Sequence, residues 1–275
     1  MTLNYRAAEF AALHRASTPL VLANTWDVAS ARIVAAAGAP AIATTSAGVA
    51  WSLGYPDGDA VDVDRAIDLI ARIAAAVDVP VTADIESGYA ADAAGVGRTV
   101  ARVLEAGAVG VNLEDAAPKG ADSPLRPAAE QAERLAAARA AATAQGVDLY
   151  INARTDVYLR AVGDPAQRLP ATLERAAAYL EAGASGIFVP GITEPAIVAE
   201  LVRGIAAPVN VLVGPGAPPV GQLAELGVAR ISTGSSLAAA AYAVAQRAAR
   251  ELAGTGTYEA LAGELDYGTL NALFG

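Results

Sequence analysis

The sequence predicts a single α/β domain folded as a (β/α)8 barrel, also called a TIM barrel. Along its 275 residues, eight short apolar runs alternate with alanine-rich amphipathic segments. The apolar runs are continuous, as is typical of parallel strands that are buried on both faces. Eight strand–helix units favour a closed barrel, for which about 250 residues is the usual length. An open doubly wound sheet is the alternative, but the chain lacks a glycine-rich dinucleotide fingerprint.

The elements follow one another at regular spacing. A helix at about 4–16 precedes the barrel. The predicted strands are 20–24, 41–46, 79–85, 109–114, 148–154, 186–190, 208–213 and 228–233. The predicted helices are 28–37, 62–76, 91–106, 127–145, 171–182, 194–203, 217–226 and 235–252. Several helices end in glycine, the usual C-terminal signal. Because no Pro/Ser-rich linker divides the chain, residues 1–275 form one predicted domain, with 253–275 as a C-terminal tail.

Charge and composition exclude several classes of function. The formal net charge is −10, so a phosphate backbone would be repelled and nucleic acid is not an expected partner. The chain has no cysteine, which excludes disulfides, zinc–thiolate sites and a cysteine nucleophile. The N-terminus does not resemble a signal peptide, and no run reaches the roughly 18 apolar residues of a membrane span. We therefore expect a cytoplasmic protein with no membrane partner.

Polar residues gather at the carboxyl ends of the predicted strands, whereas the amino ends consist mostly of small apolar residues. Barrel enzymes build their active sites at the carboxyl end. The polar positions there are Asn24–Asp27, Thr44–Ser46, Asp84, Glu86, Glu114, Asp115, Asn152–Asp156, Asn210 and Ser232–Gly234. This segregation predicts a functional site, because a purely structural barrel has no reason to separate its polar residues in this way.

Three carboxylates in this set point to a metal ion. Asp84 and Glu86 share a face if their strand continues through both, because side chains alternate along a strand. Asn112 and Glu114 share a face in the same way. Three converging carboxylates repel one another, and a divalent cation relieves that repulsion. Oxygen ligands favour Mg²⁺, with Mn²⁺ as the alternative.

Two further segments suit a carboxylate substrate. The guanidinium of Arg154 is a natural bidentate clamp for a carboxylate. The alternative role for Arg154 is a salt bridge to Asp156 or Glu114. The small residues of the segment 46–48 let backbone N–H groups approach an anion, although an ordinary tight turn explains them equally well.

For three single residues, the sequence gives weaker evidence of a functional role. Asp57 lies in the turn sequence YPDGD, where a solvated aspartate is common. Lys119 is the only lysine of the chain and lies in a loop beside the predicted metal site. The only histidine, His14, lies on the N-terminal helix, where we expect it to be a surface or packing residue.

Taken together, these motifs resemble the isocitrate lyase / phosphoenolpyruvate mutase superfamily. The resemblance extends over the whole chain and rests on NTWDVASARI, TTSAGVAWSLGYPDGD, ADIESGY, GVNLEDAAPK, INARTDVYL and IFVPGI. It implies a barrel that assembles into homodimers or tetramers by exchanging terminal helices, a role that suits the tail after residue 252.

The resemblance also implies roles for individual residues. Asp84, Glu86 and Glu114 match the family's Mg²⁺ carboxylates, some of which reach the ion through water. Asp57 matches a loop aspartate near the metal, and Lys119 matches the lysine of a gating loop. The residues that match or are expected to make substrate contacts are Ser46, Ala47, Gly48, Arg154 and Asn210.

The chain departs from the family pattern in ways that narrow the function. The loop APKGADSP lacks the cysteine that isocitrate and methylisocitrate lyases use as an acid. It also lacks the asparagine that closely follows the lysine in phosphonate-handling members. Many members have aspartate in place of Glu86. Members that decarboxylate oxaloacetate need no loop cysteine.

The main hypothesis is therefore an Mg²⁺-dependent carbon–carbon lyase or decarboxylase. It would act on a small 2-oxo or 2-hydroxy di- or tricarboxylate through an enolate. The alternatives are a phosphonopyruvate-type hydrolase or mutase, a non-catalytic 2-oxo acid binding protein and, as a minor possibility, a Schiff-base aldolase that uses Lys119.

Overall fold

A computed structural model describes residues 2–263 and 265–275 and confirms the predicted (β/α)8 barrel. Its eight strands are all parallel and pair in the order β1-β8-β7-β6-β5-β4-β3-β2. The strands are β1 (Leu20–Leu22), β2 (Ile42–Ala43), β3 (Val81–Asp84), β4 (Gly110–Glu114), β5 (Tyr150–Arg154), β6 (Gly186–Val189), β7 (Val209–Leu212) and β8 (Arg230–Ser232). Each strand is shorter than the sequence predicted, but each lies within its predicted range.

The ring closes between β1 and β2 through residues that follow these strands. Thr25 and Thr44 form an isolated parallel bridge, in which the Thr25 N–H donates to Ala43 O at 2.8 Å. The Thr45 N–H donates back to Thr25 O at 2.9 Å. Closure therefore occurs at the carboxyl end of the barrel, beside the segment 46–48 that the sequence assigned to substrate binding.

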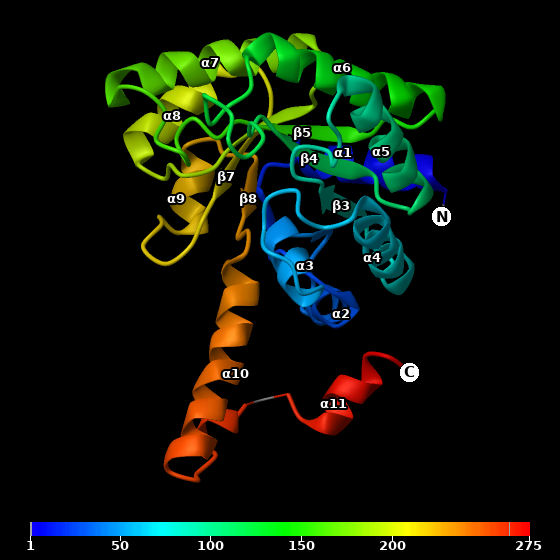
Figure 1. Cartoon of the computed structure of the whole chain (residues 1–275), viewed down its shortest axis with the longest axis vertical. Coiled ribbons are helices and arrows are strands. Elements are labelled where there is room, and N and C mark those ends of the chain that lie inside the picture. The colour runs from blue at the N-terminus through cyan, green and yellow to red at the C-terminus, as the bar shows by residue number, and fades with distance from the viewer. Residues whose placement is uncertain (1, 264) are drawn as a thin grey trace.

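Eight of the helices match the predicted strand–helix units, and Figure 1 shows several of them around the strands. They are α2 (Val28–Ala36), α4 (Val63–Ala76), α5 (Ala93–Glu105), α6 (Ala128–Ala144), α7 (Pro165–Glu181), α8 (Pro195–Gly204), α9 (Val220–Glu225) and α10 (Ser236–Gly254). The helix α1 (Leu3–Leu13) lies ahead of β1, as predicted.

The prediction placed the start of α7 at residue 171, which is wrong by about two turns. The helix begins at Pro165, where the Asp164 side chain accepts the Ala166 N–H at 2.8 Å. Pro170 lies inside the helix rather than at its start. A proline in the sixth position removes one backbone hydrogen bond, a loss that the rest of this 17-residue helix tolerates.

Amphipathic packing holds the helices on the barrel. In α5, the residues Val96, Val100 and Val103 are fully buried and recur at helical spacing. The Asp92 side chain caps this helix by accepting the Gly95 N–H at 2.7 Å. The fully buried Val81, Ala83 and Val111 on β3 and β4 belong to the same core cluster. The core thus fixes the directions in which the strand ends project.

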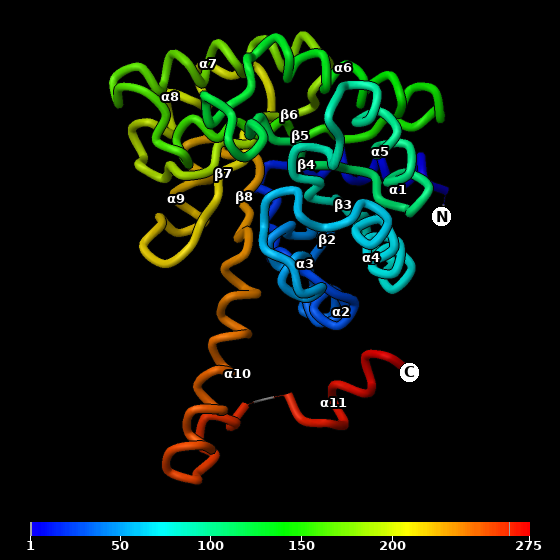
Figure 2. The backbone as a smooth tube through the Cα atoms, viewed as in Figure 1, coloured from blue at the N-terminus to red at the C-terminus, as the bar shows by residue number. Residues whose placement is uncertain are grey.

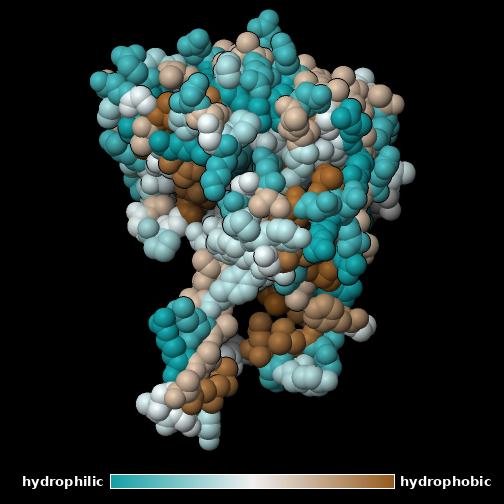
Figure 3. Space-filling view, viewed as in Figure 1, coloured by the Kyte–Doolittle hydropathy of each residue, from teal (hydrophilic) through white to brown (hydrophobic). Residues whose placement is uncertain are grey.

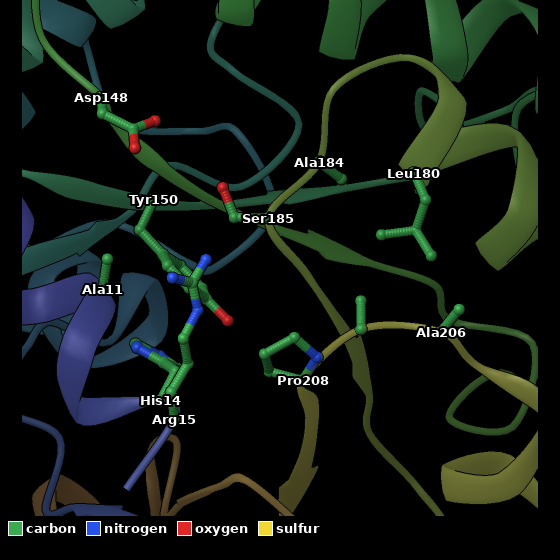
Figure 4. A pocket seen from close by; sticks show the side chains of 11 residues that line it. Ala11, His14, Arg15, Asp148, Tyr150, Leu180, Ala184, Ser185, Ala206 and Pro208 are labelled. Atoms are coloured by element: carbon green, nitrogen blue, oxygen red, sulfur yellow. The ribbon is translucent and has the colours of Figure 1, made fainter.

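His14 is a packing residue at the amino-terminal end of the barrel. Its Nδ1–H donates to Phe10 O at 2.8 Å, and its ring stacks on Tyr150 with centroids 3.7 Å apart. A cavity of about 580 Å³ lies beside it, and Figure 4 shows His14 and Arg15 near Tyr150 there. Its lining comes from the α1 region, the end of α7 and the residues at the amino ends of β5, β6 and β7, so it lies at the opposite end from the predicted site.

We expect His14 to make stability depend on pH. Burial and the nearby Arg230 lower the pKa of His14 from 6.5 to about 3, so the folded protein holds the neutral ring. The unfolded chain takes up a proton below pH 6.5, and stability therefore falls as the pH falls. Between about pH 7.5 and about pH 5.5 this group removes ~1.4 kcal/mol from the free energy of unfolding. Denaturant unfolding of wild type and His14→Phe at both pH values measures the effect; equal pH dependence in the two proteins would contradict it.

The C-terminal part of the chain projects from the barrel. Figure 2 shows α10 leading away from β8, followed by a 3₁₀ turn (Glu259–Leu261) and by α11 (Tyr267–Ala272). The end of the chain contacts α2, because Arg32 donates to Leu273 O and its guanidinium lies 5.2 Å from the Phe274 ring centroid. Apolar surface, coloured brown, is visible on this projecting part in Figure 3. Among the residues described, no helix has both the length and the apolar character needed to cross a membrane.

Candidate active site

A cavity of about 730 Å³ opens at the carboxyl end of the barrel, where the sequence predicted the site. The loops after β2, β3, β4 and β5 all contribute to its lining. Asp57, Glu114 and Lys119, which the sequence singled out, line it together with Arg126 and Arg160. Acidic residues thus come from the loop after β2 and from β4, and basic residues from the loops after β4 and β5.

Asp84 lies at the last position of β3 and connects three elements. Its backbone N–H donates to the Thr44 hydroxyl at 2.8 Å, and its Oδ2 accepts the Ser46 N–H at 3.1 Å. Its Oδ1 accepts the Glu86 N–H at 3.4 Å. The carboxylate is therefore fixed in position at the mouth of the barrel by two backbone N–H groups, those of Ser46 and Glu86.

The condition under which Asp84 and Glu86 would share a strand face is not met. β3 ends at Asp84, and Glu86 adopts a left-handed backbone conformation with φ of 52°. The buried Glu86 carboxylate accepts the Asp59 N–H and, at 3.3 Å, the Tyr89 hydroxyl. Burial raises the pKa of Glu86 to about 7, and the carboxylates of Asp59 and Asp84 add to this rise.

Glu114 and Arg154 form a buried ion pair. The two residues face each other across β4 and β5, and Arg154 Nη1 lies 2.8 Å from Glu114 Oε2. On its other side, Arg154 binds Asp156 through Nε–Oδ1 at 2.6 Å and Nη2–Oδ2 at 3.0 Å. The salt bridges named as an alternative role for Arg154 are therefore both present. Each guanidinium nitrogen makes one of these contacts, so two of the five N–H groups remain for a ligand.

Asp115, Arg175 and Tyr179 support this ion pair, and none of them had a specific predicted role. The fully buried Asp115 accepts the Asp156 N–H at 2.9 Å. Its Oδ2 accepts from Arg175 at 3.0 Å and from the Tyr179 hydroxyl at 2.8 Å. Both donors come from α7, which thus holds the loop after β5 in place. The position of Asp115 directly after Glu114 was the only signal available in the sequence.

The segment Ser46–Gly48 is the first turn of a short helix, α3 (Ser46–Ser52), which the sequence analysis did not predict. All three residues are buried. In the described chain, the N–H groups of Ala47 and Gly48 make no hydrogen bond. Unpaired N–H groups at a helix start favour a negative charge, which agrees with the predicted contact to a carboxylate.

We expect substitution of Gly48 by alanine to destabilise the protein by about 1–3 kcal/mol. A Cβ at this position would lie 2.8 Å from both Thr45 Cγ2 and Trp26 Cβ, so the carboxyl-end elements would have to shift. Denaturant unfolding measures the loss. Gly221→Ala on α9 is the matched control, because nothing lies within 4 Å of its Cβ and stability should be unchanged or slightly higher. Equal effects at both positions would show that the site is not tightly packed.

The remaining predicted residues have different surroundings. Burial and the carboxylate of Asp84 raise the pKa of Asp57, while the Ser46 hydroxyl and Arg154 oppose the rise. Lys119 is exposed on the loop after β4, at the cavity wall. Asn210 lies inside the barrel, where its Oδ1 accepts the Ser232 hydroxyl at 3.2 Å. Asn210 is absent from the cavity wall, so its contact with substrate stays a prediction.

The site offers oxygen donors to a metal ion. In the described ranges, no three His, Cys, Asp or Glu side chains form a group suited to hold a metal. Glu86 accepts from the Tyr89 hydroxyl, and Glu114 pairs with Arg154. The roles of Asp84, Glu86 and Glu114 as ligands therefore stay a prediction. The donor chemistry fits: these are oxygens only, and the electrostatic effect of Asp84 on Asp57 and Glu86 reflects a local excess of negative charge.

Comparison with known proteins agrees with this architecture. An oxaloacetate acetylhydrolase solved with its product oxalate is 25% identical and has a TM-score of 0.83, with 98% of this chain and 92% of that chain covered. A Burkholderia cenocepacia J2315 protein with the provisional name phosphonomutase is 43% identical, with a TM-score of 0.84 and coverage of 93% of this chain and 100% of that chain. The 2-methylisocitrate lyase of Escherichia coli (strain K12) is 32% identical over 213 residues, which are 76% of this chain and 70% of that protein.

The profile of the family described as phosphoenolpyruvate phosphomutase matches residues 10–253, which includes every strand and the cavity. Relatives in this group are lyases, hydrolases and mutases with the same barrel fold. The chain therefore belongs to the phosphoenolpyruvate phosphomutase family, within the isocitrate lyase / phosphoenolpyruvate mutase superfamily.

Proposed function

We propose that this protein is a Mg²⁺-dependent lyase that cleaves or decarboxylates a small 2-oxo or 2-hydroxy dicarboxylate or tricarboxylate. The main support for this proposal is that acidic and basic side chains line the same cavity at the carboxyl end of the barrel. Asp57 and Glu114 line it with Lys119 and Arg160, and Arg154 lies against Glu114. Such a cavity suits an anionic substrate that also binds a divalent cation.

Different residues would bind the cation and the substrate carboxylate. Asp84, Glu86 and Glu114 would hold the cation, with Mn²⁺ able to replace Mg²⁺, directly or through water. When bound, the cation stabilises the negative charge that gathers on the C2 oxygen of the substrate. The N–H groups of Ala47 and Gly48 and the two free N–H groups of Arg154 would hold the C1 carboxylate.

For an oxaloacetate-like substrate, the reaction breaks the bond between C3 and C4. The electron pair of that bond moves toward the C2 oxygen, CO₂ leaves, and C3 then takes up a proton. Lys119 lies at the cavity wall, where it can donate this proton or exclude water as its loop closes. Asp57 lines the same cavity and would orient the water or hydroxyl group near the cation.

The loop after β4 favours carboxylate chemistry over phosphonate chemistry. Lys119 is followed by Gly120, Ala121 and Asp122, and an aspartate repels the additional negative charge of a phosphonate. The second candidate is nevertheless a phosphonopyruvate-type hydrolase or mutase, because the matching family profile is named for phosphoenolpyruvate phosphomutase.

The products of a substrate panel separate these functions. Purified protein is incubated with oxaloacetate, 2-methylisocitrate and phosphonopyruvate, with Mg²⁺ or with a chelator, and products are identified by NMR. We expect pyruvate or another 2-oxo acid from a carboxylate substrate, with the reaction lost on chelation. Phosphate or phosphoenolpyruvate from phosphonopyruvate would support the second candidate. Tight binding of 2-oxo acids without turnover would identify a non-catalytic binding protein.

We also propose that the projecting C-terminal part, with its tail at 253–275, joins copies of the chain into a homo-oligomer. Large apolar side chains are exposed there, which is unfavourable for a free chain. They are Leu237, Tyr242, Val244, Leu252, Tyr258, Leu261, Leu265, Tyr267 and Phe274. Light scattering should give a dimer or tetramer of the 27.5 kDa chain and a smaller species after deletion of residues 257–275. A monomeric full-length chain would contradict this.

A further inference from the structure

Arg160 is a basic residue of the cavity to which neither the family resemblance nor the comparisons assign a role. It lies on the segment between β5 and α7 and lines the 730 Å³ cavity together with Asp57, Glu114 and Lys119. Its side chain is 41% exposed, compared with 16% for Arg154. Arg160 is thus at the accessible wall of the cavity, whereas Arg154 is more deeply buried and is not one of the lining residues.

One contact fixes the direction of the Arg160 side chain. Its Nε donates to Asp156 Oδ2 at 3.1 Å, and this carboxylate is fully buried. Asp156 is itself held by Arg154 and, through its backbone N–H, by Asp115. The stem of Arg160 is therefore anchored to the same carboxylate that orients Arg154.

The terminal nitrogens of Arg160 are open. Across residues 2–263 and 265–275, neither Nη1 nor Nη2 donates a hydrogen bond to the protein. Arg126, a second arginine at the cavity wall, differs because its Nη1 lies 2.6 Å from Glu130 and its side chain is 7% exposed. Two free Nη groups of one guanidinium form the flat fork that binds a carboxylate in a bidentate manner.

Charge also favours an anion beside Arg160. Arg154 is shared between Glu114 and Asp156, so the buried ion pairs already balance its charge. Asp156 in turn divides its charge between Arg154 and Arg160. Arg160 has only this shared carboxylate as a partner, so its positive charge is only partly compensated at the cavity wall.

We propose that Arg160 binds the distal carboxylate of the substrate and so selects dicarboxylates over monocarboxylates. This rests on the proposed function, in which the segment 46–48 and Arg154 hold the C1 carboxylate. A dicarboxylate held in this way would extend from Arg154 toward Arg160 at the cavity wall. A monocarboxylate of the same length leaves the Arg160 fork in contact with water only.

Two acids that differ only at the distal group test this. Oxaloacetate carries a carboxylate where 2-oxobutanoate carries a methyl group. Inhibition or binding constants for both are measured in Mg²⁺ buffer with wild type, Arg160→Gln, Arg160→Lys and Arg203→Gln. Arg203 is the matched control, because it is an exposed arginine of α8 that pairs with Glu200, and it is absent from the cavity wall.

We expect wild type to bind oxaloacetate at least tenfold more tightly than 2-oxobutanoate. Arg160→Gln should abolish this preference by weakening oxaloacetate alone, Arg160→Lys should restore part of it, and Arg203→Gln should keep it. If wild type bound the two acids equally, or if Arg160→Gln weakened the binding of both equally, the proposed distal site would be wrong while the proposed function would stand. Equal weakening would mean that Arg160 acts only by holding Asp156. If wild type binds neither acid, the proposed function itself is wrong and the distal site fails with it.

Discussion

Replacing Asp84 by asparagine should lower kcat/KM at least about 1000-fold, which is ~4 kcal/mol of lost transition-state stabilisation. Asp84 contacts neighbouring elements through the Ser46 N–H and the Thr44 hydroxyl, so the neutral amide keeps the shape of the site. It removes the charge that the proposed cation needs. Calorimetric titration with Mg²⁺ should show the loss of binding directly.

The matched control for this substitution is Asp64→Asn on α4. The Asp64 carboxylate is 76% exposed and pairs with Arg102 at 2.6 Å, away from the cavity. Its replacement should leave both Mg²⁺ binding and activity unchanged. If Asp84→Asn kept the wild-type affinity for Mg²⁺, the assignment of Asp84 as a ligand would be wrong.

Replacing Arg154 by methionine should have the second large effect, on both stability and substrate binding. The substitution leaves Glu114 without its ion pair and leaves Asp156 with Arg160 alone. Removal of one partner of a buried pair costs about 3 kcal/mol or more. The Michaelis constant for a carboxylate substrate should rise at least about tenfold, or ~1.4 kcal/mol.

Arg154→Lys separates these two effects. Lysine restores a positive charge beside Glu114, so denaturant unfolding should recover part of the lost stability. It cannot reproduce the planar fork, and the Michaelis constant should therefore stay high. An unchanged Michaelis constant in Arg154→Met would remove Arg154 from the substrate site and leave it a purely structural residue.

The barrel was predictable because its signals are local and repeated. Continuous apolar runs, helix-ending glycines and the polar carboxyl ends of the strands each point to the same fold. The errors arose where one residue type fits two positions. The helix predicted from residue 171 begins earlier, so that Pro170 lies inside α7, and the segment 46–48, for which a tight turn was one of two alternatives, begins α3.

The roles predicted for the site residues stay predictions, and the structure shows only where these residues lie. Asp57, Glu114 and Lys119 do line one cavity, although they come from three segments of the sequence. The left-handed turn at Glu86 was not predictable, because strand alternation says nothing about where a strand ends. Arg160 was missed because its importance depends on an open guanidinium and a shared Asp156, which only the tertiary structure shows.

The account depends on a divalent cation held beside the substrate by acidic side chains at the barrel mouth. A crystal grown with Mn²⁺ and oxalate tests this most directly, because manganese gives an anomalous signal that locates it independently. We predict one strong peak adjacent to Asp84, with oxalate between that peak and the segment 46–48. A well-ordered cavity with no anomalous peak near Asp84, Glu86 or Glu114 at saturating Mn²⁺ would contradict the account.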